Sequence, residues 1–267
     1  MHPDLFSIGP LTIHTYGLFV AIGFVLGILV AVRTGKYVGM TAQHVIDMGF
    51  IIMVSGIIGS RLAYILENVS YYYAHPLDMV RLWHGGLVFS GGLIAVLLVM
   101  IWYARQHQLS IWRVGDVWTP AVALGQAIGR IGCFMAGCCY GRPTDVCWAV
   151  TFTNPKSIAP LNIPLHPTQL YSSLSGLIIF IVLMVLTAKK KFEGQVMLWF
   201  LILHSTGRLL IERFRGDDRG SIFGNSGWTL TQLLAMIILI ASVILLFTRK
   251  SQGKKDDLES RNPPSHS

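Results

Sequence analysis

Long apolar stretches separated by short polar loops dominate the chain. Four stretches of 17 to 22 residues contain no charged side chain, and three more are interrupted by a single arginine at Arg61, Arg130 or Arg208. The uncharged stretches are residues 16–32, 85–104, 167–188 and 228–248, and the interrupted ones are about 47–66, 116–137 and 195–214. About 20 apolar residues in a helix span the hydrocarbon core of a bilayer. The pattern therefore predicts an all-α integral membrane protein with seven transmembrane helices.

Composition supports a membrane protein and argues against a large soluble enzyme. Of the 267 residues, 53% are hydrophobic and only 13% are charged, whereas soluble domains carry roughly 25% charged residues. The formal net charge of +8 raises the alternatives of nucleic acid or anionic lipid as a partner. The positions of the charges decide between them.

The lysines and arginines in the loops are distributed unequally between the two sides of the predicted helices. Twelve lie on the side of the C-terminus and six on the other. Because positive residues concentrate in cytoplasmic loops, we expect the N-terminus outside and the C-terminus in the cytoplasm. The basic charge then serves topology and contact with membrane lipid, and no nucleic-acid partner is expected. No lysine or arginine precedes Arg33, which indicates that the first span is retained and is not a cleaved signal peptide.

Three regions follow from this topology. Residues 1–248 form one membrane domain, and its longest outer segment, about 138–166, is expected to form a small extracytoplasmic cap. Trp148, Val150 and Phe152 alternate with smaller residues there, which favours a short β segment. Residues 249–267 combine charges with serine, glycine and proline, and we expect a disordered basic cytoplasmic tail.

The three intramembrane arginines are predicted to lie at one depth. An acidic residue stands near the start of each stretch, and the arginine lies 14 or 15 residues after it. This spacing places each arginine about 21–22 Å above the inner boundary of the membrane. Glu212 lies four residues after Arg208 and is the expected partner of that arginine. A guanidinium group binds phosphate bidentately, so Arg61 and Arg130, which have no such partner, favour a phospholipid-headgroup site in the outer leaflet. Snorkelling or pairing with backbone carbonyls is the alternative, and for Arg61 it is equally favoured.

Four segments together resemble the prolipoprotein diacylglyceryl transferase family. Residues 129–141, GRIGCFMAGCCYG, resemble its G-R-x-G-N-F-x-N-G-E-x-x-G signature, and residues 166–171, HPTQLY, resemble its H-P-S-Q-L-Y motif. Residues 83–93, WHGGLVFSGGL, resemble its double Gly-Gly helix start, and residues 208–215, RLLIERFR, resemble its arginine-rich segment. The resemblance extends from the first span to about Asp218.

This resemblance implies an enzyme of the bacterial plasma (inner) membrane whose active site faces the extracytoplasmic leaflet. It would transfer the diacylglyceryl group of phosphatidylglycerol to the lipobox cysteine in the signal peptide of a preprolipoprotein. The products would be a thioether and glycerol phosphate, which is the first step of lipoprotein maturation. No cofactor and no metal are expected.

The resemblance also assigns roles to residues. Arg130 and Arg208 would bind the phospholipid, with Arg61, Gly129 and Gly141 as further members of the binding site. Catalytic roles would fall to Arg208, Tyr16 and a histidine. Structural or undefined roles remain for Glu212, Arg215, Cys133, Cys138 and Ser90.

Four positions depart from the family pattern. Ser90 stands where the family has the histidine proposed to deprotonate the thiol, and Ser172 stands in place of a glutamate. Cys133 and Cys138 replace an asparagine and a glutamate of the signature. The base is therefore open between His84 and His166, both of which are expected at outer helix starts.

Four cysteines lie within fifteen residues, at Cys133, Cys138, Cys139 and Cys147. They could form a disulfide, ligate a metal or supply a nucleophilic thiol, but their spacing matches no familiar zinc pattern. Packing as small apolar side chains is the favoured interpretation. Two other functions stay open: a related enzyme with another acceptor, and a lipid carrier or scramblase without chemistry. A thiol-redox enzyme is less favoured.

Overall fold

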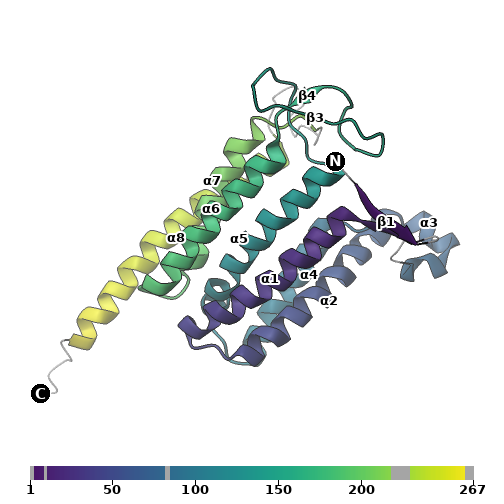
Figure 1. The fold of residues 1–267 in the computed structure, drawn as a ribbon. Coiled ribbons are helices and arrows are strands. Elements are labelled where there is room, and N and C mark those ends of the chain that lie inside the picture. The colour runs from purple at the N-terminus through teal and green to yellow at the C-terminus, as the bar shows by residue number, and fades with distance from the viewer. Residues whose placement is uncertain (1–2, 9–10, 82–84, 218–228, 262–267) are drawn as a thin grey trace, which may run out of the picture.

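The computed structural model describes residues 3–8, 11–81, 85–217 and 229–261. Most of these residues are helical, and the long helices lie side by side (Figure 1). The elements are β1 (Asp4–Ile8), β2 (Leu11–His14), α1 (Thr15–Val38), α2 (Ala42–Glu67), α3 (Val69–Ala74), η1 (Pro76–Val80), α4 (Phe89–Gln106), α5 (Ile111–Ala136), β3 (Val150–Thr151), β4 (Pro164–Leu165), α6 (Thr168–Lys189), α7 (Gln195–Glu212) and α8 (Leu230–Arg261).

Each of the seven predicted spans falls on a long helix among the described residues. Five helices, α1, α2, α4, α6 and residues 230–250 of α8, are long and apolar enough to cross a membrane. Helices α5 and α7 are not among the five, because polar side chains such as Gln126, Arg130, His204 and Arg208 interrupt them. The structure thus supports a multi-pass helical membrane protein, and the two long helices outside this set of five carry Arg130 and Arg208.

Helix α5 is central in the arrangement. It contacts α1 on one side and α6 and α7 on the other (Figure 1). Helix α8 packs on α7, and α2 pairs with α4. The Thr34 hydroxyl donates to the Val117 carbonyl at 2.8 Å, and the Ser173 hydroxyl donates to the Ala127 carbonyl at 2.7 Å. These two bonds fix α1 and α6 to opposite sides of α5.

Small residues allow α2 and α4 to approach closely. A Cβ atom added to Gly91 would lie 2.6 Å from the carbonyl oxygen of Gly59, and one added to Gly59 would lie 2.7 Å from that of Gly91. Helices in lipid associate through such small residues, because backbone contact replaces a hydrophobic driving force. Helix α4 starts at Phe89 and not at the predicted residue 85, because Gly85 and Gly86 both have positive φ angles, 79° and 77°.

A buried carboxylate holds the start of α7 against α5. Asp116 is fully buried and accepts hydrogen bonds from the backbone N–H groups of Gly194 (2.9 Å) and Met197 (3.0 Å). It also pairs with Lys190 Nζ at 3.1 Å. An anion at a helix N-terminus is favoured by the helix dipole. Asp116 therefore sets the position of α7 relative to α5.

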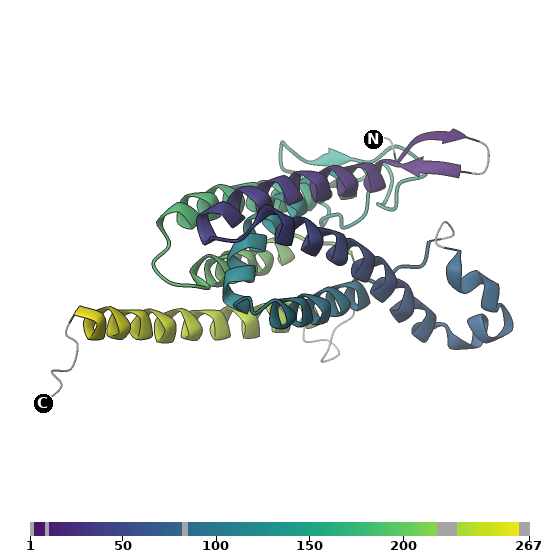
Figure 2. The same ribbon diagram turned by 90° about the horizontal axis from the view of Figure 1, so that it is seen from below.

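The short β segment predicted within residues 138–166 is present. Strands β3 and β4 pair antiparallel, and Phe152, Ala159 and Leu165 form a small buried core beneath them. A second hairpin, β1–β2, was not predicted from the sequence, and Asp4 of this hairpin pairs with Lys156 of the cap at 2.6 Å. The hairpin lies at the end of the molecule opposite to the end of α8 (Figure 2).

The end of α8 differs from the sequence prediction. Disorder was expected from residue 249, yet the backbone stays helical through Arg261. Adding a residue to an existing helix costs much less than starting one, and most of the added residues are good helix formers. Residues 262–267 lie outside the described residues.

Candidate functional site

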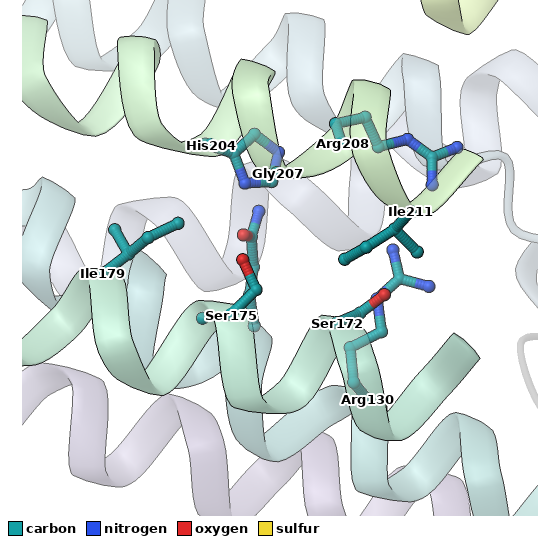
Figure 3. Close-up of a pocket in the computed structure, with 10 residues that line it drawn as sticks. Arg130, Ser172, Ser175, Ile179, His204, Gly207, Arg208 and Ile211 are labelled. Carbon is teal, nitrogen blue, oxygen red and sulfur yellow. The ribbon is translucent and has the colours of Figure 1, made fainter. Parts of the chain in front are cut away.

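A small polar cavity lies between α5, α6 and α7 (Figure 3). Its polar lining comes from each of the three helices: Gln126 and Arg130 of α5, Ser172 and Ser175 of α6, and His204 and Arg208 of α7. The free space is about 40 Å³, which suits one or two water molecules. A phosphate group can therefore enter only if side chains move apart.

Arg130 extends into this cavity from α5 and is half-buried. No carboxylate among the described residues lies within ion-pair distance of it. A guanidinium group without a counter-charge in an apolar environment is costly, and an anionic ligand would relieve that cost. Arg130 is therefore the strongest candidate for binding a phosphate.

Arg208 enters the same end of the cavity from α7 (Figure 3). Its Nη2 lies 2.9 Å from Oε2 of Glu212, which confirms the i, i+4 pair predicted from the sequence. The Glu212 side chain is 4% exposed and accepts a further hydrogen bond from the Thr229 hydroxyl at 3.2 Å. Glu212 thus neutralises and orients Arg208, whereas Arg130 has no such carboxylate among the described residues.

Sequence reasoning missed three polar residues of the cavity, Ser175 and two that precede the arginines. Gln126 and His204 each precede an arginine by four positions, and both line the cavity. The i, i+4 spacing puts each on the same helix face as its arginine, so this signal was present in the sequence. His204 stacks on Phe200 with ring centroids 5.4 Å apart, which fixes its ring beside the arginines.

Arg61 has a different environment from the one predicted. It is 6% exposed and donates hydrogen bonds to five backbone carbonyls of the segment that leads to α4. The acceptors are Asp78, Met79, Arg81, Gly85 and Gly86, at 2.6 to 3.2 Å. Its donors are therefore used within the protein, and Arg61 does not line the cavity. These contacts favour the alternative interpretation of Arg61, pairing with backbone carbonyls, over phospholipid binding.

Of the two histidines proposed as bases, His166 does not line the cavity. His84 lies outside the described residues. His166 is in the cap, where its Nδ1 lies 3.2 Å from the Tyr171 hydroxyl and its ring packs on Phe214. The same hydroxyl accepts a hydrogen bond from Trp148 Nε1 at 2.7 Å. His166 is thus tied to a cap network next to the cavity.

Tyr16 and Ser90 lie at exposed starts of helices. Tyr16 is 46% exposed, and its ring lies against α5 at Gly132, two residues beyond Arg130. Ser90 is exposed on α4, in the α2–α4 pair and not beside the cavity. Tyr16 is therefore near the arginine-bearing turn, and Ser90 is not brought to it.

The two signature glycines that the resemblance assigns to lipid binding, Gly129 and Gly141, have different surroundings. A Cβ atom on Gly141 would lie 2.4 Å from the carbonyl oxygen of His166 and 2.9 Å from that of Phe214. Gly141 therefore lies where the chain passes between the segment just before α6 and the segment just after α7. No space for a ligand is left there. A Cβ atom on Gly129 would have no neighbour within 4 Å, so that position is open.

We expect Gly141→Ala to destabilise the protein by about 1–3 kcal/mol, because the added methyl group forces two backbone segments apart. The melting temperature of the detergent-purified protein should fall by several degrees. Gly129→Ala is the matched control, and because it lies in a helix with open space around it, its melting temperature should stay the same or rise. An equal fall for both variants would contradict the assigned role of Gly141.

Three of the four cysteines gather at the end of α5. The Sγ atoms of Cys133, Cys138 and Cys139 all lie within 4.8 Å of one another, and none of the three forms a disulfide. Hydrogen bonds from Cys133 and Cys138, together with one from Arg215, hold the pKa of the Cys139 thiol below its ordinary value. Arg215 is 5% exposed and also forms a bidentate pair with Asp217. Arg215 therefore supports the cap and the cysteines and does not line the cavity.

A larger hollow of about 350 Å³ lies between α2 and α4. Its lining is apolar apart from Ser55, and it contains no charged group. Such a surface suits acyl chains or neighbouring lipid, and it offers nothing to a phosphate. Of these two hollows, the smaller one is the one lined by charged groups.

Comparisons with known proteins agree with this picture. The sequence profile described as prolipoprotein diacylglyceryl transferase matches residues 3–248. Relatives named phosphatidylglycerol–prolipoprotein diacylglyceryl transferase include one from Bordetella parapertussis, 37% identical over 94% of this chain and 97% of the relative. Those from Vibrio cholerae and Clostridium tetani are 35% and 33% identical, over 96% and 92% of this chain and 94% and 96% of the relatives.

Proposed function

The chain belongs to the prolipoprotein diacylglyceryl transferase family, and we propose that the cavity between α5, α6 and α7 binds the phosphate of phosphatidylglycerol. The protein is a membrane transferase of lipoprotein biosynthesis that takes phosphatidylglycerol as donor and a prolipoprotein as acceptor. One observation supports the location most strongly. Arg130 faces the cavity without a carboxylate partner among the described residues, and Arg208 enters at the same end.

The two arginines suit a reaction that expels a phosphate. In the proposed step, the lipobox thiol sulfur attacks the glyceryl carbon that carries the phosphate ester oxygen. A sulfur–carbon bond forms as the carbon–oxygen bond breaks, and the electron pair leaves with glycerol phosphate. Negative charge grows on the phosphate as this bond breaks, and fixed guanidinium groups stabilise that charge more than the starting ester.

The thiol proton needs an acceptor, and the structure favours a residue that the sequence did not suggest. His204 is the histidine of the described residues that lines the cavity. It lies one turn from Arg208, so a phosphate held by the arginines would lie beside it. His84 and His166 remain the alternatives that the sequence offers.

We expect His204→Gln to lower the turnover number by about 10²-fold, as is typical when a general base is removed. Transfer from labelled phosphatidylglycerol to a lipobox peptide, followed against pH, measures this. The same assay on His166→Gln and His84→Gln provides the comparison. A His204→Gln enzyme with the turnover number and pH profile of the wild type would exclude His204 as the proton acceptor.

The membrane placement is also part of the proposal. The chain is a multi-pass bacterial membrane protein with apolar helices. We propose seven spans in the inner membrane, with the cap outside and the end of α8 in the cytoplasm. The opposite ends occupied by the β1–β2 hairpin and the end of α8 (Figure 2) support an odd number of spans, and the lysine and arginine distribution supports the orientation. The acceptor cysteine would then approach on a signal peptide from the outer leaflet.

Family membership favours transfer over a lipid carrier or scramblase, and an assay separates them. Purified protein is supplied with phosphatidylglycerol labelled in its diacylglyceryl group, together with a lipobox peptide or the same peptide with cysteine replaced by serine. We expect a thioether product and free glycerol phosphate only with the cysteine peptide. Movement of lipid between leaflets without a covalent product would support a carrier, and a product with a different acceptor class would support the related-enzyme alternative.

A further inference from the structure

The chain brings three thiols to one point by ending α5 abruptly. The helix stops at Ala136, and Gly137 reverses the chain with a φ of 74°. Cys138 then returns over the helix end, where its backbone N–H donates to the Cys133 carbonyl at 3.2 Å. Cys139 adopts a φ of 62°, which is uncommon for a residue with a side chain. This turn brings Cys138 and Cys139 to the side of Cys133.

The turn is held in place by the start of α6. The Thr168 hydroxyl donates to the Cys139 carbonyl, and the Gln169 amide nitrogen donates to the Cys138 carbonyl, both at 2.8 Å. Thr168 and Gln169 are fully buried, so water does not readily compete for these two hydrogen bonds. The three thiols are therefore arranged before any ligand arrives, which lowers the entropy cost of binding one.

The spacing of the sulfur atoms suits a single metal ion. A thiolate binds a soft metal at about 2.3 Å, so three sulfurs in a trigonal plane are about 4.0 Å apart and cannot exceed about 4.6 Å around one ion. The three Sγ atoms lie within 4.8 Å of one another, so small side-chain rotations suffice. The group contains no histidine, aspartate or glutamate among the described residues, which leaves a three-sulfur ligand set.

The local charges also favour a cation. The carbonyl groups at the C-terminus of α5 carry partial negative charge, and three thiolates would add to it. The buried guanidinium group of Arg215 would balance one of them from the cap side, and a bound cation would balance a second.

We propose that Cys133, Cys138 and Cys139 form a three-coordinate binding site for Cu(I). Thiolate ligands select soft ions such as Cu(I), whereas Zn(II) prefers four ligands and Mg²⁺ or Ca²⁺ prefer oxygen. Binding exchanges protons on the thiols for the metal and involves no change of oxidation state. The site is separate from the cavity of Arg130 and Arg208 and does not depend on the proposed function.

The test is a titration of the full-length detergent-purified protein with Cu(I) under anaerobic reducing conditions, in competition with a chromophoric Cu(I) chelator. We expect one tightly bound Cu(I) per chain. Cys133→Ser, Cys138→Ser and Cys139→Ser should each weaken binding at least 10-fold. Cys147→Ser is the matched control, because Cys147 is exposed and lies outside the cluster, and it should bind Cu(I) as the wild type does.

Two further measurements keep the proposal falsifiable if a serine variant does not fold. X-ray absorption on the wild-type protein with one equivalent of Cu(I) should show three sulfur neighbours at about 2.3 Å and no nitrogen or oxygen neighbour. Thiol titration of the denatured apoprotein should find all four cysteines reduced. A disulfide within the cluster, no retained Cu(I), or an equal loss of binding in Cys147→Ser would overturn the proposal.

Discussion

Replacing Arg130 with alanine is expected to reduce transfer from phosphatidylglycerol by about 10²–10³-fold while the protein still inserts into the membrane. Arg130 faces the cavity without a carboxylate partner among the described residues, so its loss leaves no buried partner uncompensated. Removing one fixed donor to a developing negative charge has a cost of this size. Arg130→Lys should recover only part of the rate, because lysine keeps the charge but loses the bidentate geometry.

The matched control for Arg130→Ala is Arg113→Ala on the same helix. Arg113 pairs with Glu193 on the surface, with both side chains 39% exposed, and such pairs contribute little to stability. We expect normal transfer from Arg113→Ala. Turnover by Arg130→Ala at the wild-type rate, in protein that is inserted and monodisperse, would exclude Arg130 from the phosphate site.

Replacing Arg208 with alanine should cause two losses that can be separated. The first is stability, because Glu212 would keep a buried charge without its ion-pair partner, at a cost of about 3 kcal/mol or more. The second is transfer, because the cavity loses one of its two guanidinium groups. We expect transfer to fall by about 10²-fold or more even in the fraction that stays folded.

The double variant Arg208→Ala/Glu212→Gln distinguishes these effects. Glutamine removes the unpaired charge and can still accept a hydrogen bond from Thr229, so most of the lost melting temperature should return. Transfer should remain as low as in Arg208→Ala alone. If the double variant recovers both stability and transfer, Arg208 serves only to balance Glu212.

The helical architecture was largely predictable from sequence, because membrane spans depend on length and apolar composition. All seven predicted stretches fall on helices of the described chain. The short N-terminal hairpin was not predicted, since its pairing depends on tertiary contacts such as Asp4 with Lys156. Disorder of the tail was predicted from composition alone, and composition does not show that α8 can continue into the tail.

The candidate site was predictable only in part. The pairing of Arg208 with Glu212 follows from spacing on one helix, and the structure confirms it. Arg61 shows the limit of this reasoning, because its carbonyl acceptors are up to 25 residues away in sequence and no local pattern reveals them. His204 was in the same i, i+4 relation to Arg208 and was overlooked.

The cysteines illustrate a second limit. On a continuing helix, Cys138 and Cys139 would point to different faces, and the linear spacing indicated no metal site. The helix ends at Ala136, and two left-handed residues change the direction of both side chains. Gly137 was a visible stop signal, but the positive φ of Cys139 depends on the hydrogen bonds from α6.

Native mass spectrometry of lipid-bound protein tests most directly whether Arg130 holds the headgroup. Wild-type protein, Arg130→Ala and Arg113→Ala are purified alike and offered equal amounts of phosphatidylglycerol and phosphatidylethanolamine. We expect the wild type and Arg113→Ala to retain one phosphatidylglycerol that Arg130→Ala releases. Equal retention of phosphatidylglycerol by Arg130→Ala and the wild type would contradict the placement of the donor lipid between α5, α6 and α7.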